Sequence, residues 1–126
     1  MSNRTEINLE FIFACSTPML HKFLTTSEGL KSWFCDDVVI KNELYTFSWE
    51  GETEKALLKE DPTKTNILFE WQGREVPEST FFEIISSPIT RETILKVMTV
   101  CDEPFQDEEA IYWNNIIKIL KTATGG

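Results

Sequence analysis

The side chains most often used in catalysis occur here in few combinations. His21 is the single histidine of the chain, so a metal site built on two imidazoles cannot form within one copy. The sequence has no CxxC, HExxH, GxSxG or GxGxxG motif and no phosphate-binding loop. We interpret His21 as a structural residue rather than an acid–base catalyst. The sequence therefore predicts no metal and no cofactor, and it identifies no catalytic residue.

The thiols point to a reducing environment rather than to a reactive site. Cys15, Cys35 and Cys101 are an odd number of cysteines at wide spacing. In a chain that starts without an apolar signal segment, they are expected to be free thiols, which predicts a cytoplasmic protein. Asp36 and Asp37 follow Cys35, and neighbouring carboxylates raise the pKa of a thiol. Cys35 is therefore not expected to be a nucleophile.

Charged residues near the predicted strands offer a second source of acid–base chemistry. Glu70, Glu75 and Glu83 would be general bases only if they faced a cavity. The alternation around Glu70 points its side chain away from the aromatic face of its strand, which favours a solvated role. Arg74 and Arg91 flank predicted turns and are interpreted as surface charges rather than as clamps for an anion.

Aromatic residues are the strongest functional candidates. The chain has nine Phe and four Trp, and such side chains bring a large apolar area into a core or a pocket. One interpretation is that they fill the core, as aromatic residues usually do. The other is that they line an apolar cavity between a sheet and a helix, because four Trp make an irregular filling that close packing does not require. The predicted lining residues are Trp33, Phe34, Tyr45, Phe47, Trp49, Phe69, Trp71, Phe82, Trp113 and Ile117.

The composition excludes several classes of partner. The net charge is −9 without any Lys/Arg cluster, whereas a nucleic-acid-binding surface needs a basic face. An anionic membrane surface would repel the chain for the same reason, and no apolar stretch approaches the length of a membrane-spanning helix. With 126 residues and no linker or repeat, the chain is expected to form one domain over residues 1–126.

The elements that would position these residues follow from the spacing of apolar positions. Period-two alternation predicts strands, and the short links between them favour antiparallel pairing. Ser16 and Pro18 are typical of a helix start, and Ser27 is expected to cap a second short helix that ends at Trp33. Ser79–Ser86 is apolar on both faces and is expected to be buried on both. The predicted strands are Thr5–Phe13, Val38–Lys41, Glu43–Glu50, Glu52–Glu60, Thr65–Gln72, Ser79–Ser86 and Glu92–Val100.

One long amphipathic helix is predicted over Asp107–Lys121. Asp107 is the expected N-cap, because a carboxylate there accepts backbone N–H groups of the first turn. Residues 122–126 are expected to be a frayed tail. The apolar stripe, at spacings of three and four, consists of Ala110, Trp113, Ile116, Ile117 and Leu120.

The order of one strand, two short helices, six strands and a long helix resembles the START-like superfamily, also called SRPBCC, helix-grip or Bet v 1-like. Within it, the chain is similar to the branch related to the C-terminal domain of the Hsp90 ATPase activator Aha1. The resemblance implies an α+β helix-grip fold, in which a curved antiparallel sheet of about six to seven strands wraps around the C-terminal helix. Two short helices would follow the first strand. The residues that carry the resemblance are Thr26–Leu30 with Trp33-Phe34, Phe69-Glu70-Trp71, and Asp107-Glu108-Glu109 with Trp113, Ile117 and Leu120.

The resemblance also implies a function. Members of this superfamily hold lipids, sterols, polyketides or other hydrophobic molecules in a deep cavity between the sheet and the last helix. We therefore expect a protein that binds a hydrophobic or amphipathic small molecule or lipid without catalysis. Two alternatives stay open: a protein–protein interaction module of the Hsp90-activator type with a chaperone as partner, and an enzyme of the cyclase or hydrolase type.

Two departures weigh against the chaperone role. Cys101-Asp102-Glu103-Pro104 stands where that branch often has a histidine or glycine after the last strand. No counterpart of the activator's separate N-terminal domain is expected within these residues. A homodimer remains a further candidate, since the edge strand predicted at Val38–Lys41 offers unpaired backbone groups to a second copy.

Overall fold

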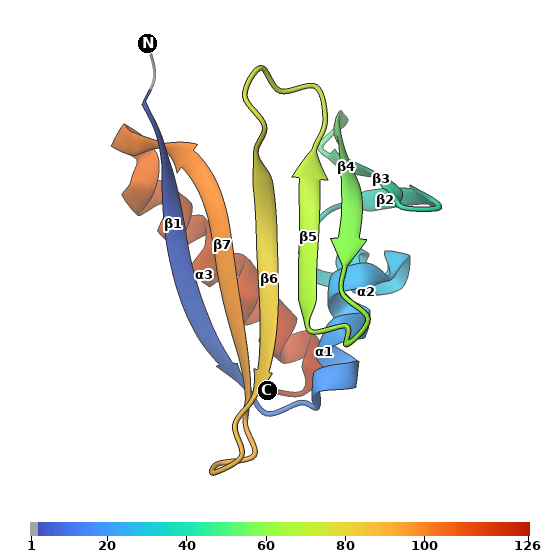
Figure 1. Ribbon diagram of the computed structural model, residues 1–126, viewed down its shortest axis with the longest axis vertical. Coiled ribbons are helices and arrows are strands. Elements are labelled where there is room, and N and C mark those ends of the chain that lie inside the picture. The colour runs from blue at the N-terminus through green and yellow to red at the C-terminus, as the bar shows by residue number, and fades with distance from the viewer. Residues whose placement is uncertain (1–2) are drawn as a thin grey trace.

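Residues 3–126 are described by a computed structural model, in which seven strands form one curved sheet (Figure 1). The strand order is β1-β7-β6-β5-β4-β3-β2, and every neighbouring pair is antiparallel, which confirms the predicted pairing. β1 and β2 form the two edges, so the segment proposed for dimer pairing does lie at an edge. The strands are β1 (Arg4–Phe13), β2 (Asp37–Lys41), β3 (Leu44–Trp49), β4 (Glu52–Glu60), β5 (Asn66–Trp71), β6 (Ser79–Ser86) and β7 (Thr93–Asp102).

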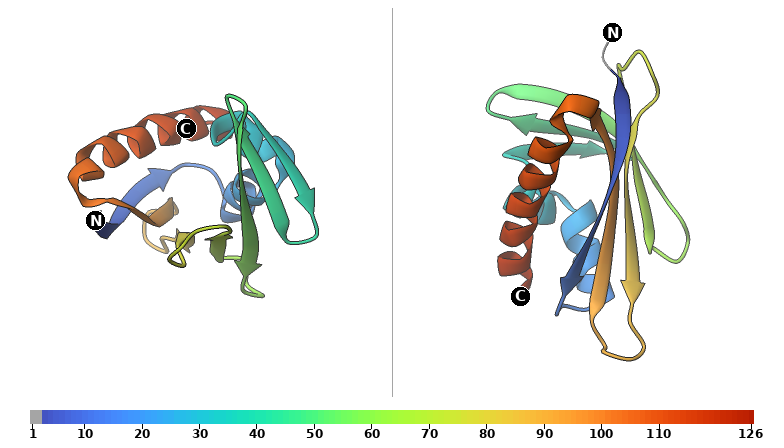
Figure 2. Two further views of the ribbon diagram at one scale, coloured as in Figure 1. Left: turned by 90° about the horizontal axis from the view of Figure 1, so that it is seen from above. Right: turned by 90° about the vertical axis from the view of Figure 1, so that its left-hand side faces the viewer.

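The alternation of apolar residues places one face of the sheet against the helices. Leu9 of β1 lies opposite Val97 of β7, which lies opposite Phe82 of β6, and this row belongs to the core or packs against it. The next row, with Met98 opposite Phe81, points to the other face. Within residues 3–126 no helix covers that outer face, as Figure 2 shows. The expected burial of β6 on both faces is therefore wrong, and Phe81 is only half-buried.

Two short helices connect β1 to β2. Helix α1 (Thr17–Thr25) starts where predicted, because the Ser16 hydroxyl accepts a backbone N–H of the first turn at 3.3 Å. Helix α2 (Ser27–Trp33) is capped by Thr26, whose hydroxyl accepts a backbone N–H at 3.1 Å, and not by Ser27 as expected. Thr26 takes this position because it also ends α1, so one residue closes the first helix and opens the second.

The long helix α3 (Gln106–Thr124) crosses the inner face of the sheet (Figures 1 and 2). A single 3-10 turn, Glu103–Phe105, joins β7 to this helix. Phe105 occupies the N-cap position without a side-chain hydrogen bond, so the prediction that Asp107 caps the helix is wrong. The turn places Asp107 inside the first turn, where its charge still suits the positive end of the helix dipole.

The C-terminal end of α3 is ordered by its own contacts rather than frayed. The helix continues to Thr124, which is buried, and Gly125 ends it in a left-handed conformation at φ 94°. The carbonyl of Gly126 then accepts the backbone N–H of Ala14 at 2.8 Å, which ties this end to the segment after β1. The expectation of a frayed tail over residues 122–126 is therefore wrong.

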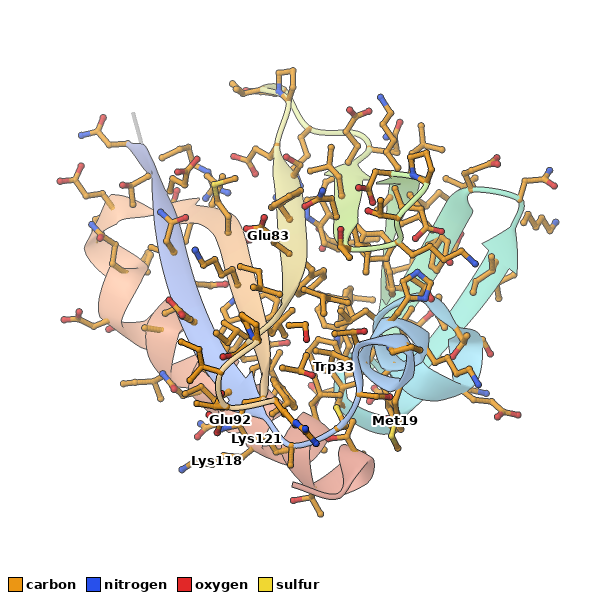
Figure 3. The ribbon with its side chains drawn as sticks, turned by 60° about the horizontal axis from the view of Figure 1, so that its bottom comes forward. Met19, Trp33, Glu83, Glu92, Lys118 and Lys121 are labelled. Atoms are coloured by element: carbon orange, nitrogen blue, oxygen red, sulfur yellow. The ribbon has the colours of Figure 1, made fainter. Side chains whose placement is uncertain are left out.

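The core lies between α3 and the inner face of the sheet. Trp113, Ile117 and Leu120 of the predicted stripe are at most 3% exposed. Trp33 of α2 lies inside, whereas Lys118 of α3 extends outward (Figure 3). No helix within residues 3–126 combines the length and the hydropathy that crossing a bilayer requires.

Candidate functional site

A cavity of about 460 Å³ lies at the end of the sheet where β7 ends and α3 begins. The curved sheet provides one side of this cavity and the first half of α3 provides the other. Its lining consists mainly of an aromatic group and a charged group. The aromatic group is Phe34, Trp49, Trp71, Phe105, Tyr112 and Trp113. The charged group is Arg4, Glu54, Arg74, Glu78, Asp102 and Glu109.

The tryptophans of the aromatic group are held in place through their own polar atoms. The indole N–H of Trp49 donates to a carbonyl at the end of α2 at 2.6 Å. That of Trp71 donates to the Thr80 hydroxyl at 2.9 Å, and that of Trp113 donates to Glu109 Oε2 at 2.9 Å. Because all three N–H groups are taken, these rings offer a ligand apolar surface rather than hydrogen-bond donors.

The structure divides the ten residues predicted to line a ligand cavity into two groups. Four of them, Phe34, Trp49, Trp71 and Trp113, are on the wall of this cavity. The others are buried in the core between the sheet and the helices. Residues on the same face of the sheet lie at different positions along the strands, so only some of them reach the cavity. These six are Trp33, Tyr45, Phe47, Phe69, Phe82 and Ile117.

The charged group forms a connected network that includes residues not singled out by the sequence. Arg4 donates to both carboxylate oxygens of Glu78, at 2.6 and 2.8 Å, and to Asp102 at 2.9 Å. Arg74 donates to Glu78 at 2.6 Å and to Glu54 at 3.1 Å. Arg74, interpreted from the sequence as a surface charge, is therefore a member of this network. Arg4 and Glu78 are 74 positions apart, so no local spacing indicates their contact.

Glu78 is the centre of the network, and its side chain is only 9% exposed. The hydrogen bond from Arg4 is the largest influence on its titration and lowers the pKa of Glu78 below its usual value, with Arg74 adding to this effect. Burial of the carboxylate acts in the opposite direction but is outweighed. The hydrogen bonds to Glu78 and to Asp102 hold the pKa of Arg4 above its ordinary value.

Acid is expected to destabilise the protein partly through Glu78 and Asp61. The pKa of Asp61 is lowered to about 2, chiefly by a hydrogen bond from Thr63 and with further help from Asn66 and Thr65. Both carboxyl groups bind protons more weakly in the folded chain than in the unfolded chain, so the unfolded state gains protons first. Their stabilisation is complete above about pH 5 and is lost as the pH falls toward the folded-state values. We expect the thermal midpoint, followed by circular dichroism, to fall across this window.

A matched pair of variants tests the share of Glu78. Glu78→Gln should flatten part of the acid slope of the thermal midpoint, because the group that titrates is gone. Glu52→Gln, at an exposed position outside the network, should keep the slope of the parent. An identical acid slope in Glu78→Gln and the parent would show that the Arg4–Glu78 contact does not control acid stability.

Polar groups deeper in the cavity are neutral. The hydroxyls of Thr80 and Thr99 lie 3.0 Å apart and satisfy one another. Burial raises the pKa of the Cys101 thiol, and the carboxylate of Glu109 raises it further. The thiol is therefore protonated at neutral pH and is not activated for attack.

The other residues considered for acid–base chemistry lie outside this cavity. His21 Nε2 is 2.7 Å from Glu60 Oε2, between α1 and β4. Burial, and then the two neighbouring aspartates, raises the pKa of Cys35 to about 11, which agrees with the expectation that it forms no thiolate. Glu70 pairs with Lys59 at 3.0 Å on the outer face, as its alternation predicts. Among residues 3–126 no three His, Cys, Asp or Glu side chains converge to hold a metal ion. Also outside the cavity lining are Glu75, Glu83 and Arg91.

Comparison with known proteins identifies the fold. A family model described as a START-like superfamily domain matches residues 1–126. Among curated proteins no match was found. The solved structures similar to this chain include the Aha1 dimer from Colwellia psychrerythraea, with a TM-score of 0.80 and 16% identity over 95% of this chain and 96% of that chain.

Two further solved structures agree with this result. A protein from Bacillus halodurans has a TM-score of 0.77 and 15% identity over 98% of this chain and 99% of that chain. A protein from Bacteroides fragilis has a TM-score of 0.67 and 22% identity over 98% of this chain and 93% of that chain. At these identities the similarity shows a shared fold.

Proposed function

The chain belongs to the START-like superfamily, and from this membership we propose that it binds a small molecule with an apolar body in the cavity between the sheet and α3. The observation that carries the proposal is the cavity itself, at about 460 Å³. Sites for small molecules in proteins commonly measure about 300–1,000 Å³ and combine apolar walls with a few polar groups. The aromatic group and the charged group of this cavity fit that description.

Affinity would come mainly from the aromatic wall. Each Å² of apolar surface removed from water contributes about 25 cal/mol, so a ring held against the aromatic group gains substantial binding energy. The charged group also lines the cavity and would orient the polar end of the ligand. These residues suit ligand binding better than acid–base catalysis. The Glu78 carboxylate is already hydrogen-bonded to two arginines, and the pKa of the Cys101 thiol is raised.

Trp71→Ala is expected to weaken the binding of a neutral, environment-sensitive dye such as N-phenyl-1-naphthylamine. The substitution removes an aromatic face from the wall, and the lost contact area corresponds to an affinity about tenfold lower. Dye fluorescence titrated against folded protein measures the effect, with circular dichroism confirming that the variant is folded.

The matched control distinguishes this cavity from a groove of about 330 Å³ on the outer face of the sheet, where Phe81 and Met98 lie. Phe81→Ala should leave dye affinity unchanged if the dye enters the inner cavity. If Phe81→Ala weakens the dye and Trp71→Ala does not, the dye binds on the outer face and Trp71 is not part of the binding site.

A second candidate function is protein–protein contact through the outer face or the β2 edge. The observation that favours it is the exposure of apolar side chains there: Ile12 is 51% exposed and Val39 is 53% exposed. The similar Colwellia psychrerythraea structure is described as a dimer. A second copy of this chain, or a chaperone as partner, would bury such side chains.

Native mass spectrometry of the freshly purified protein separates the two candidates. A mass excess that disappears on denaturation would support a ligand carried in the cavity, and extraction would then identify its class. A spectrum without such an excess, together with a dimer that increases with protein concentration, would favour the interaction role. The proposal of a carried ligand would be abandoned if the mass were that of the chain alone and neutral dyes also failed to bind.

A further inference from the structure

Building on the proposed function, we propose that the cavity selects a cationic ligand: an amine or quaternary ammonium group joined to an aromatic or other apolar body. Three properties of the cavity lead to this inference. They are the balance of charge on its wall, the contacts that its arginines already make with carboxylates, and the hydrogen bonds that already occupy its tryptophan N–H groups.

The charge on the cavity wall is negative. Four carboxylates, those of Glu54, Glu78, Asp102 and Glu109, stand against the guanidinium groups of two arginines, a formal excess of two negative charges. The chain as a whole carries a net charge of −9, so the wider field of the protein adds to this local excess. A cation entering the cavity is attracted by both, whereas an anion is repelled by both.

The arginines do not provide a free site for an anion. Arg4 already contacts Glu78 and Asp102, and Arg74 already contacts Glu78 and Glu54. An anionic ligand would have to compete with these carboxylates for the guanidinium groups. Each carboxylate has about four acceptor positions, so the network retains acceptors for an ammonium N–H even while it holds the arginines.

The tryptophan rings favour the same sign of charge. Their N–H groups are hydrogen-bonded within the protein, so they offer no donor to an anion, and the parts of these rings that attract charge are their electron-rich faces. The structure contains one example of what such a face binds: Arg74 Cζ lies over the Trp71 ring, 5.4 Å from its centroid. Attraction of a cation to an aromatic face is strongest for tryptophan and grows when water is excluded.

Glu109 connects the carboxylates to the aromatic wall. It lies on the first half of α3, and its Oε2 accepts the indole N–H of Trp113 at 2.9 Å. An ammonium group that contacts Glu109 would therefore also be close to the Trp113 ring. Glu108, one residue earlier, is exposed and does not line the cavity.

Three probes with the same naphthalene ring and different charge test the inference. They are 1-naphthylmethylamine, a cation at neutral pH, 1-naphthylmethanol, which is neutral, and 1-naphthylacetate, an anion. We expect calorimetric titration at low salt to give an affinity for the cation about tenfold higher than for the anion, with the neutral probe between them. Added salt should reduce the difference, because the carboxylates are partly exposed.

A pair of variants locates the preference in the cavity. Glu109→Gln removes one charge while its amide oxygen still accepts the Trp113 N–H, so the affinity for the cation should fall by about threefold to tenfold and that for the neutral probe should stay unchanged. Glu108→Gln removes the same charge outside the cavity and should change neither affinity by more than a small factor. Equal losses in the two variants would overturn the inference, because the attraction would then come from the overall charge.

The outcomes for the probes are distinct from those for the proposed function. If the neutral probe binds and the anion binds as tightly as the cation, the preference for a cation is wrong and the binding function stands. If none of the three probes binds to folded protein, the binding function fails and the charge preference fails with it.

Discussion

Phe47→Ala is expected to lower the free energy of unfolding by about 3–5 kcal/mol, the usual cost of removing a buried phenylalanine. Phe47 is fully buried at 0% exposure and lies at the centre of the aromatic cluster. The space left by its ring cannot be refilled without moving several rigid rings, so most of the cavity penalty should remain. Chemical denaturation followed by circular dichroism measures the loss. The five rings around it, with centroids within 5.9 Å, belong to Phe34, Tyr45, Trp49, Phe69 and Trp71.

Phe105→Ala is the appropriate comparison, since it deletes the same side chain at a position that is 56% exposed. A surface change of this kind usually costs about 0.5 kcal/mol or less. Similar losses in the two variants would mean that the aromatic cluster around Phe47 is loosely packed. The aromatic residues around Phe47, which we assign to the core, would then be mobile enough to become part of the cavity lining.

Gly29→Ala is expected to destabilise the protein by about 1–3 kcal/mol, although alanine is the better helix former. A Cβ at position 29 would lie 2.5 Å from the carbonyl oxygen of Lys22 and 2.5 Å from Cα of Phe23. Both atoms belong to the backbone of α1, so the clash cannot be relieved by rotating a side chain. The gain in helix propensity, about 1 kcal/mol, should offset only part of this cost. Thermal and chemical denaturation measure the net effect.

Lys31→Ala introduces alanine at an exposed position of the same helix, so it changes helix propensity without changing the packing between α1 and α2. This variant should stay within about 0.5 kcal/mol of the parent in stability. If Gly29→Ala were as stable as the parent, the two helices would not need their close approach. That approach matters for the site, because α2 supplies Trp33 to the core and is followed by Phe34 on the cavity wall. The indole N–H of Trp33 also donates to the carbonyl of Phe23 at 2.8 Å, which links α2 back to α1.

The elements of the fold were predictable from the sequence because they depend on local spacing. Alternation along β3 places Tyr45, Phe47 and Trp49 on one face whatever the rest of the chain does. The stripe through Trp113 and Ile117 similarly defines the buried side of α3. These features are set by backbone geometry over a few residues.

The errors arose where the surroundings of an element, rather than its own spacing, decide its ends or its burial. Thr26 replaced Ser27 as the cap of α2, because the end of α1 and the start of α2 share a residue. The last turn of α3 stayed ordered, because Gly126 meets the backbone of Ala14, far away in the chain. Neither outcome follows from spacing within one segment.

The sequence by itself determined that an aromatic inner face packs against a C-terminal helix in a sheet of antiparallel strands. Only the tertiary structure decided which aromatic residues line a cavity, because the curvature of the sheet and the position of α3 determine how deep each row is buried. It also decided the charge of that cavity, since Arg4, Glu78 and Asp102 come together from β1, the segment before β6 and the end of β7. Contacts across 74 and 98 positions depend on strand order and register, which local patterns do not specify.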